Sequence, residues 1–439
     1  MNDHESNWRP APDRDCVVGM NFYASRGDGT GGVIKRKHDD FRVTELSTVD
    51  PEPLTADEDD YPHLLVRARL RGWDTHDFVD RLSGELGISR RRVSWAGTKD
   101  KHAVTDQLFS IRSVDPESLP SVSRAELSPV GRLGRSLTFG DLAGNRFDIR
   151  VRDATTPANH ERITRELRQL GDGRVTVPNY FGHQRFGSMR PITHEVGLAI
   201  LRRDWEDAVM TYLASTHPDE PCDTRTFRSY VGETRDWQAA LDRCPGGLGF
   251  ERTLLHGLIE GDYRDALDRL PQTLQGLFVN AAQSYLFNQI ISERIERGLS
   301  IVEAVAGDVV CFTERHPELG SVPAIDRTQR VTEARRRTIE RHVARGRACV
   351  TAPLVGSETT FAAGEPGDIE RTVLQWASVD RAQFDLPEPY ASRGTRRAIH
   401  VNTDLSIDQT PFRLRFGLPS GSYATVVLRE YLKPDGPLG

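Results

Sequence analysis

Hydrophobic and polar residues alternate along several short segments in the first third of the chain. Within 63–70, the apolar residues Leu64, Val66, Ala68 and Leu70 are interleaved with basic ones, which predicts a strand with one buried face. Similar segments cover residues 33–35, 41–45, 93–95, 108–112, 136–139 and 147–151. We therefore predict a sheet of several strands in this part of the chain.

Other segments carry apolar residues at helical spacing. Phe78, Val79, Leu82 and Leu86 fall on one face of a predicted helix that Thr75 can cap. Residues 159–171 form another predicted helix. From about 198 to 385 the pattern is mainly helical, and the predicted helices are 198–214, 263–270, 273–298, 326–346 and 370–378.

The last part of the chain returns to strand patterns at 397–402 and 412–416. A short helix is predicted from Tyr423 to Leu432, with Ser422 as its N-cap. A strand-rich start, a helical middle and a strand-rich end predict an α+β fold in which a helical insertion interrupts one sheet domain. We place the sheet domain at residues 1–197 and 396–439, and the insertion at residues 198–395.

Composition narrows the class of protein. At 439 residues the chain is long for one domain, and its net charge is −6. No apolar run approaches the ~20 residues that cross a bilayer, and the N-terminus has no hydrophobic signal region. The five cysteines are far apart and form no C-x-x-C pair, which argues against a disulfide framework and a zinc knuckle. We expect a cytoplasmic protein without a membrane span.

Basic residues are unevenly distributed between lysine and arginine. Only five of the 58 are lysines, and four of these are Lys35, Lys37, Lys99 and Lys101. A GC-rich genome, a salty cytoplasm or plain codon bias would each favour arginine, whereas a retained lysine suits a compact, point-like donor. The arginine run from 335 to 347 is either a solvated helix face or a surface that contacts phosphates.

One short turn carries candidate chemistry. In Val93–Gln107, a strand, a turn beginning with glycine and a second strand starting at Ala103 place Asp100 between Lys99 and Lys101. Nearby ammonium groups favour an ionised carboxylate, and such a carboxylate at a loop tip can act as a nucleophile. The alternative is a solvated β-turn, because Gly, Asp and Lys are ordinary turn residues.

A second loop, residues 177–187, interleaves aromatic and polar side chains. Tyr180, Phe181 and Phe186 alternate with amide, imidazole and guanidinium groups, a composition that suits single-stranded RNA. A small core of buried aromatic residues is the alternative. The glycine-rich segment 27–32 is followed by strands rather than a helix and lacks G-K-[ST], so it is not a nucleotide-binding loop.

Five ordered segments together resemble the TruD family of pseudouridine synthases. They are G-T-G-G-V-I-K with D-F-R-V-T-E (29–45), A-G-T-K-D-K-H-A-V-T-D-Q (96–107), P-N-Y-F-G-H-Q-R-F-G (178–187), A-A-Q-S-Y-L-F-N-Q (281–289) and L-P-S-G-S-Y-A-T with R-E (418–430). The resemblance extends over the whole chain. It implies a mixed, mostly antiparallel catalytic sheet, interrupted by a largely helical family-specific insertion, with a cleft for RNA.

The resemblance also implies a reaction and its residues. The reaction is isomerisation of uridine to pseudouridine at position 13 of tRNA, without a metal or an organic cofactor. Asp100 matches the family's catalytic aspartate, and Lys35 matches a basic residue beside it. The positions that contact the target nucleoside are matched by Phe41, Asn179, Phe181 and Tyr423. Some family members carry Phe where this chain has Tyr423. We expect a monomer whose partner is tRNA.

Two other functions remain to be weighed. A non-catalytic RNA-binding protein could keep the same fold, although the intact Lys99-Asp100-Lys101 turn argues against it. A hydrolase using Asp100 would need a partner base or a metal constellation, and the sequence offers neither. The acidic net charge argues mildly against RNA binding, but local clusters of arginine can outweigh it.

Overall fold

A computed structural model describes residues 8–99, 101–171, 173–187, 189–434, 436 and 438. The chain divides into two compact units. We call the first the helical unit; it comprises Met1–Arg26, Val177–Thr313 and Pro323–His400. We call the second the sheet unit; it comprises Gly27–Thr176, Glu314–Val322 and Val401–Gly439. The domain boundaries predicted from the sequence, at 197/198 and 395/396, stay a prediction.

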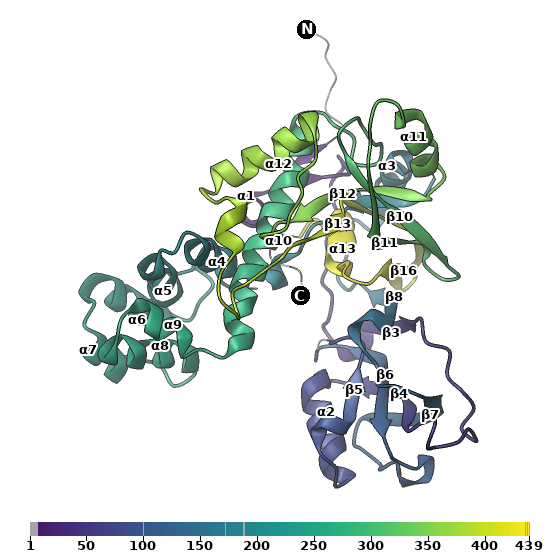
Figure 1. Ribbon diagram of the computed structural model, residues 1–439, viewed down its shortest axis with the longest axis horizontal. Helices are drawn as coiled ribbons and strands as arrows, with labels where there is room; N and C mark the ends of the chain where they lie inside the picture. Colours follow the sequence, from purple (N-terminus) through teal and green to yellow (C-terminus); the bar gives the residue numbers. More distant parts are fainter. Residues whose placement is uncertain are drawn as a thin grey trace. The chain divides into compact units, whose positions relative to one another are not determined.

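An eight-stranded sheet forms the centre of the sheet unit (Figure 1). Its strands follow the order β15-β16-β8-β3-β6-β4-β7, and β5 also pairs with β6. Strands β3 and β6 pair in parallel, and the other described pairs of this sheet are antiparallel. The strands are β3 (Phe41–Ser47), β4 (His63–Arg71), β5 (Val93–Trp95), β6 (Val104–Arg112), β7 (Ala125–Leu133), β8 (Leu142–Arg150), β15 (Ser406–Gln409) and β16 (Phe412–Pro419).

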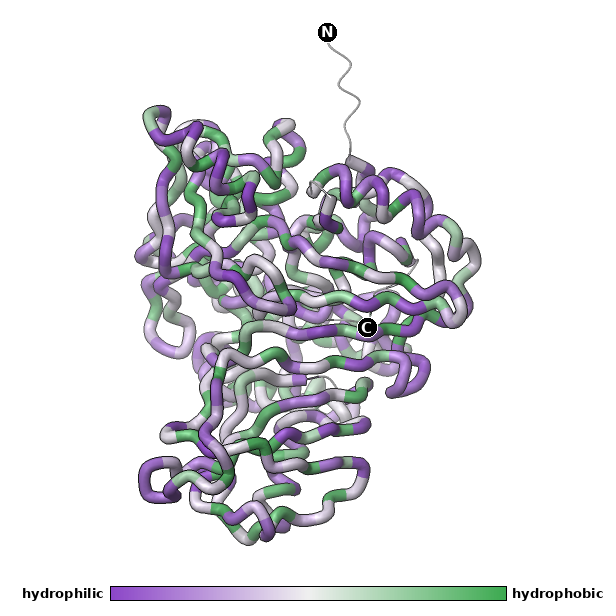
Figure 2. The backbone as a smooth tube through the Cα atoms, turned by 90° about the vertical axis from the view of Figure 1, so that its right-hand side faces the viewer, coloured by the Kyte–Doolittle hydropathy of each residue, from purple (hydrophilic) through white to green (hydrophobic). Residues whose placement is uncertain are grey.

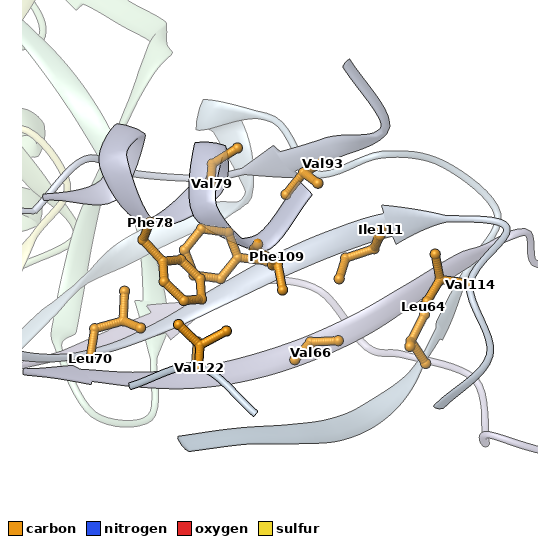
Figure 3. Close-up of a cluster of buried hydrophobic side chains, with 12 residues drawn as sticks. Leu64, Val66, Leu70, Phe78, Val79, Val93, Phe109, Ile111, Val114 and Val122 are labelled. Atoms are coloured by element: carbon orange, nitrogen blue, oxygen red, sulfur yellow. The ribbon is translucent and has the colours of Figure 1, made fainter. Parts of the chain in front are cut away.

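Among its described residues, the sheet unit contains three α-helices, α2 (Thr75–Glu85), α3 (Asn159–Leu170) and α13 (Ala424–Leu432). Helix α2 packs its apolar face on the sheet and closes a core against β4, β5 and β6 (Figure 3). Phe78 of α2 meets Phe109 of β6 with ring centroids 5.2 Å apart. Four short 3-10 turns complete the local structure at His38–Asp40, Arg90–Arg92, Pro116–Ser118 and Phe139–Asp141.

Helices dominate the other unit. The longest described helix there, α10, runs over 25 residues from Gln272 to Glu296 and packs against α4, α9 and α12 (Figure 1). The remaining helices are α1 (Asp13–Cys16), α4 (Thr193–Leu201), α5 (Trp205–Ala214), α6 (Cys222–Thr234), α7 (Trp237–Arg243), α8 (Gly249–Glu260), α9 (Tyr263–Asp268), α11 (Arg336–Ala344) and α12 (Gly364–Trp376), with 3-10 turns at His183–Arg185 and Arg381–Phe384.

The remaining strands lie outside the eight-stranded sheet. A four-stranded sheet has the order β11-β10-β12-β13, with β10 and β12 as an antiparallel pair at its centre. Two further pairs are β1 with β2 and β9 with β14. The bounds are β1 (Arg9–Pro10), β2 (Phe22–Tyr23), β9 (Val175–Pro178), β10 (Val309–His316), β11 (Gly320–Arg330), β12 (Ala348–Leu354), β13 (Thr395–Ala398) and β14 (His400–Thr403).

The mixed α+β class with mainly antiparallel strands is therefore confirmed. Along the strands, hydrophilic and hydrophobic positions alternate as the sequence pattern predicted (Figure 2). In the described part of the chain, no helix is both long enough and apolar enough to pass through a membrane.

Several predictions of local structure were wrong. Asp74, not Thr75, caps α2, because the Asp74 carboxylate accepts the backbone N–H groups of His76 and Asp77. Tyr423 takes the N-cap position of α13 in place of Ser422, without a capping side-chain bond. Residues 136–139 are not a strand and lead instead into a 3-10 turn.

In the middle of the chain, two of the helices predicted from the sequence also differ from the elements observed. The predicted helix 198–214 is two helices, because Arg203 adopts a left-handed φ of 59° and Asp204 then caps a new helix. The predicted helix 326–346 begins instead as the end of strand β11, and only Arg336–Ala344 is helical. Strands β10 and β12 were not predicted. Their apolar runs are short and fit a helix as well as a strand, so that pairing in the tertiary structure decides between the two.

Candidate active site

Lys35 and Phe41 lie together in the sheet unit. The Lys35 ammonium sits 4.8 Å from the centroid of the Phe41 ring, which is within the range of a cation–π interaction. Lys35 has a left-handed φ of 59°, a conformation that non-glycine residues adopt only where the surroundings hold them. Phe41 is the first residue of β3, and its ring meets Phe147 of β8 edge to face at 6.2 Å.

An ion pair between a buried carboxylate and a half-buried arginine fixes the turn between these two residues. The Asp40 carboxylate accepts two hydrogen bonds from the Arg152 guanidinium, at 2.7 and 2.8 Å, and one from the Lys37 backbone N–H at 2.9 Å. The Arg152 hydrogen bond is the main reason that the pKa of Asp40 lies below its usual value. Because the backbone of Arg152 also exchanges two hydrogen bonds with Val33, the start of β3 and the Lys35 turn are held by one residue.

The loop before position 100 is anchored by Lys99. The Lys99 ammonium donates to Oε1 of Glu45 over 2.6 Å, and both side chains are almost fully buried, at 8% and 2% exposure. Glu45 Oε2 accepts the backbone N–H of Leu108 at 3.0 Å, so both carboxylate oxygens are bound. The ammonium of Lys99 is thus directed into the sheet toward a carboxylate on β3.

The same ion pair explains why residue 97 is a glycine. A Cβ atom at this position would lie 2.8 Å from Lys99 Nζ and 3.0 Å from Glu45 Oε1. These distances are tighter than side chains tolerate, so a larger residue would displace the ion pair. The glycine of the A-G-T-K-D-K segment is therefore needed for a close approach of the chain to this ion pair.

Thr75 holds the backbone of the same loop. Its hydroxyl oxygen accepts the Lys99 N–H at 2.9 Å, and the hydroxyl donates to Gln107 Oε1 at 3.1 Å. Gln107 in turn donates to the Thr105 hydroxyl at 2.7 Å. All three side chains are buried. The chain of hydrogen bonds ties the loop to both α2 and β6.

The candidate catalytic residue, Asp100, lies outside the described residues. Next to it in the sequence, Lys101 and His102 are exposed, and the His102 ring stacks on that of His38 with centroids 6.3 Å apart. Tyr423 is half-buried at the start of α13, which follows strand β16. The predicted meeting of Lys35 with Asp100 stays a prediction.

Two candidate residues lie in the helical unit, where Arg397 links them. Asn179 is buried; its Nδ2 donates to the Ala398 carbonyl at 2.9 Å, and its Oδ1 accepts from Arg397 at 2.8 Å. The amide is therefore already engaged on both sides, and its first effect is to orient Arg397.

Phe181 is also buried, at 6% exposure. The Arg397 guanidinium lies 3.7 Å above its ring centroid, and the Phe287 ring meets it edge to face at 5.6 Å. The backbone around Phe181 is fixed by the Asn288 side chain, which accepts the Phe181 N–H and donates to the Phe181 carbonyl. The two other aromatic residues of this loop, Tyr180 and Phe186, are fully buried core residues.

The structure thus groups the sequence-predicted residues in two sets, Lys35 with Phe41 in one unit and Asn179 with Phe181 in the other. Sequence reasoning missed Glu45, Thr75, Arg152 and Arg397. Glu45 does stand inside a quoted motif, but nothing in the sequence shows which partner it would meet. Among the described residues, no three His, Cys, Asp or Glu side chains gather as a metal ion would require.

Comparisons with known proteins show the family to which the chain belongs. Residues 17–431 match the family described as tRNA pseudouridine synthase D (TruD). A Halobacterium salinarum relative named as a probable tRNA pseudouridine synthase D is 53% identical over 429 residues, covering 97% of this chain and 99% of the relative. A Natronomonas pharaonis protein of the same name is 52% identical over 426 residues, covering 95% and 97%.

A solved structure extends the comparison to the fold. The crystal structure named for the tRNA pseudouridine synthase D (TruD) of Methanosarcina mazei has 37% sequence identity and a TM-score of 0.81, and covers 97% of this chain and 99% of that chain. Fold and sequence together define an RNA-modifying isomerase of the pseudouridine synthase class. The chain belongs to the TruD family of tRNA pseudouridine synthases.

Proposed function

We propose that this protein converts uridine to pseudouridine at position 13 of tRNA, with Asp100 as its catalytic carboxylate. Membership of the TruD family supports the reaction and the RNA class. The observation that carries the residue assignment is the anchoring of its neighbour: Lys99 is fixed through its ammonium by Glu45 and through its backbone by Thr75. A loop held at this many points suits a residue that must meet a substrate atom accurately.

The proposed reaction rearranges the nucleoside without net gain or loss of atoms. The bond between C1′ of the ribose and N1 of uracil breaks, and a bond forms between C1′ and C5. The proton on C5 is released, and N1 takes up a proton. An ionised Asp100 attacks the nucleoside, at either the base or the sugar carbon, so that the detached uracil can turn before it is rejoined.

The target nucleoside must first leave its stack, which costs a few kcal/mol. We assign Phe41, Phe181 and Tyr423 to contacts with the flipped nucleoside, because aromatic faces stack bases. Lys35 would offer a positive charge next to the reacting groups. Asn179 would act through Arg397, which it orients by a hydrogen bond of 2.8 Å.

The test compares wild type with Asp100→Asn on tRNA transcripts. We expect wild type to convert uridine 13 and the variant to bind the same tRNA without converting it. Equal pseudouridine from both would overturn the role of Asp100. Tight tRNA binding by wild type without any pseudouridine would favour the non-catalytic RNA-binding function instead.

The proposal includes a monomer that acts in the cytoplasm, where its tRNA substrate would be found. Light scattering of the purified protein, alone and with tRNA, measures the mass of the complex. A mass of one chain with one tRNA is the expected result, and a two-chain complex would contradict it.

A further inference from the structure

The arginine run of the sequence analysis lies on and around helix α11. Residues 327–347 contain eight arginines and two glutamates, a net charge of +6. Because the whole chain carries −6, all other residues together carry −12. Positive charge is therefore concentrated in one segment of 21 residues within the helical unit.

Helix α11 is fixed to its sheet by its other side. Ile339 is buried at 2% exposure, and the His342 ring meets Phe312 of β10 edge to face at 6.0 Å. Helix α11 also contacts β12 and lies beside the β10–β12 strands (Figure 1). These contacts leave the remaining face of α11 directed away from the sheet.

Three arginines follow one another along that exposed face. Arg337, Arg341 and Arg345 are spaced four residues apart and are all exposed. Side chains at this spacing line one side of a helix, and the rise of 1.5 Å per residue spreads them over about 12 Å. We call these three residues the α11 stripe.

Several other exposed arginines on helices of this unit have carboxylate partners. Arg336 is held by Glu340 at 2.8 Å, Arg371 by Asp368 at 2.7 Å and Arg264 by Asp268 at 3.9 Å. Within the part of the chain that the structure describes, no carboxylate lies within 4 Å of a guanidinium of the α11 stripe. The neighbouring Arg336 shows that a carboxylate partner at the right spacing is possible on the same helix.

We propose that the α11 stripe binds the phosphate backbone of the RNA substrate. This inference rests on the proposed function for its choice of partner. Three guanidinium groups without a carboxylate partner carry charge that a phosphate can neutralise, and guanidinium forks match phosphate oxygens in pairs. Arg341 already donates from Nε to the Arg337 carbonyl at 3.2 Å and from Nη2 to the Thr338 hydroxyl at 3.3 Å, so its contribution is mainly its charge and its remaining N–H groups. Contacts of this kind position an RNA without reading its sequence.

The physical consequence is a defined salt dependence. Each neutralised phosphate releases counterions, so the logarithm of the binding constant falls with the logarithm of salt concentration by about 0.7–0.9 per contact. Removing three contacts should therefore reduce this slope by about 2 to 3. It should raise KM for tRNA while leaving kcat at saturating tRNA unchanged, because contacts with phosphates hold the RNA and take no part in the bond changes of the reaction.

The experiment uses the full chain, an unmodified tRNA transcript and two triple variants. The first changes Arg337, Arg341 and Arg345 to Gln. The matched control changes the carboxylate-paired residues Arg336, Arg371 and Arg264 to Gln, which removes the same charge from exposed helix positions of the same unit. Fluorescence anisotropy gives the dissociation constant of each protein over a series of KCl concentrations.

We expect the stripe variant to lose at least about tenfold in affinity at the lowest salt and to lose about 2 to 3 from the slope. The control should stay within about threefold of wild type, because a paired arginine is less available to phosphate. Equal affinities and slopes for the two triple variants would overturn the proposal. A stripe variant that lowers kcat at saturating tRNA would also contradict it.

The outcome for the stripe is separable from that for the reaction. If wild type makes no pseudouridine but the stripe variant alone loses tRNA affinity, the RNA-binding role of the α11 stripe is supported and the proposed reaction is wrong. If wild type makes pseudouridine and both triple variants bind tRNA equally well, the proposed reaction is supported and the RNA-binding role of the α11 stripe is wrong.

Discussion

The ammonium group of Lys99 donates a hydrogen bond to Glu45 over 2.6 Å, although 54 positions separate the two residues. The contact forms because β3 and β6 are parallel neighbours and the loop with Lys99 leads into β6. From the sequence, the two lysines around Asp100 were expected to act alike as neighbouring positive charges. The structure gives them different tasks: Lys99 is buried and bound to Glu45, whereas Lys101 is exposed.

Glu45→Gln should destabilise the sheet unit and slow the reaction. Removing one partner of a buried ion pair costs about 3–5 kcal/mol, since the remaining charge is left without its counterion. The loop that bears Asp100 would shift, and kcat should fall by about 10- to 100-fold while tRNA affinity changes little. Urea unfolding and single-turnover assays measure the two effects.

The double variant Glu45→Gln with Lys99→Met is the control for this prediction. It removes both charges, so stability should return toward that of wild type. If positioning is the role of the pair, kcat should stay low in the double variant. A double variant with full kcat would show that the ion pair serves stability alone.

Thr75→Val should affect the same loop through its backbone. The valine keeps the shape of the side chain but leaves the Lys99 N–H and Gln107 Oε1 without the hydroxyl that now binds them. Each buried polar group without a partner costs about 1–3 kcal/mol. We expect a lower melting temperature and a lower kcat, and Thr75→Ser, which retains a hydroxyl, should recover most of both. A valine variant as active as the serine variant would refute this role.

Phe181→Ala should lower turnover more than it lowers tRNA affinity. Stacking on an aromatic side chain is worth about 1–3 kcal/mol per base, or about 5- to 150-fold in rate, whereas tRNA is held mainly through phosphates. Single-turnover kinetics and anisotropy on the same tRNA separate the two quantities. A matching fall in both would count against a role at the target base.

Because Phe181 is buried under Arg397, a stability control is needed for that result. Phe181→Leu and Phe384→Leu each replace one buried aromatic ring of the helical unit by an aliphatic side chain. Both should lose stability to a similar degree. Only the change at Phe181 should reduce kcat for the folded protein.

His400 makes the stability of the helical unit depend on pH. Burial lowers the pKa of His400 to about 4, and its Nδ1 lies 2.8 Å from the Ile301 carbonyl oxygen. Because the unfolded value is about 6.5, the unfolded chain binds more protons between these two pH values. The stabilisation is therefore complete above pH 6.5 and is lost as the pH falls toward 4, by at most about 3 kcal/mol.

His400→Asn tests this pH dependence, since its amide can still donate to Ile301 and does not titrate. Free energies of unfolding at pH 7.5 and 5.0 should differ less in the variant than in wild type. His194, whose pKa burial also lowers to about 4, should account for part of the remaining difference. An unchanged difference in the variant would exclude His400 as a source.

Local sequence was enough to predict the elements whose pattern is long and periodic. The strand at 63–70, the helix at 75–86 and the helix at 273–298 agree with β4, α2 and α10 within a few residues. The spacing of apolar residues along each of these segments identifies the face that will be buried. This holds because each element must bury its apolar face, whichever element it packs against. The ordered motifs likewise gave the family, which the comparisons confirm.

Only the tertiary structure decided how the motif residues are used. Asp74 displaced Thr75 from the cap, which left the Thr75 hydroxyl to hold the Lys99 backbone. The parallel pairing of β3 with β6 brings Glu45 into contact with Lys99. Arg397 contacts both Asn179 and Phe181, which lie more than 200 positions away in the sequence. A sequence fixes which groups are available, but hydrogen bonds and ion pairs depend on distances that strand register and packing set.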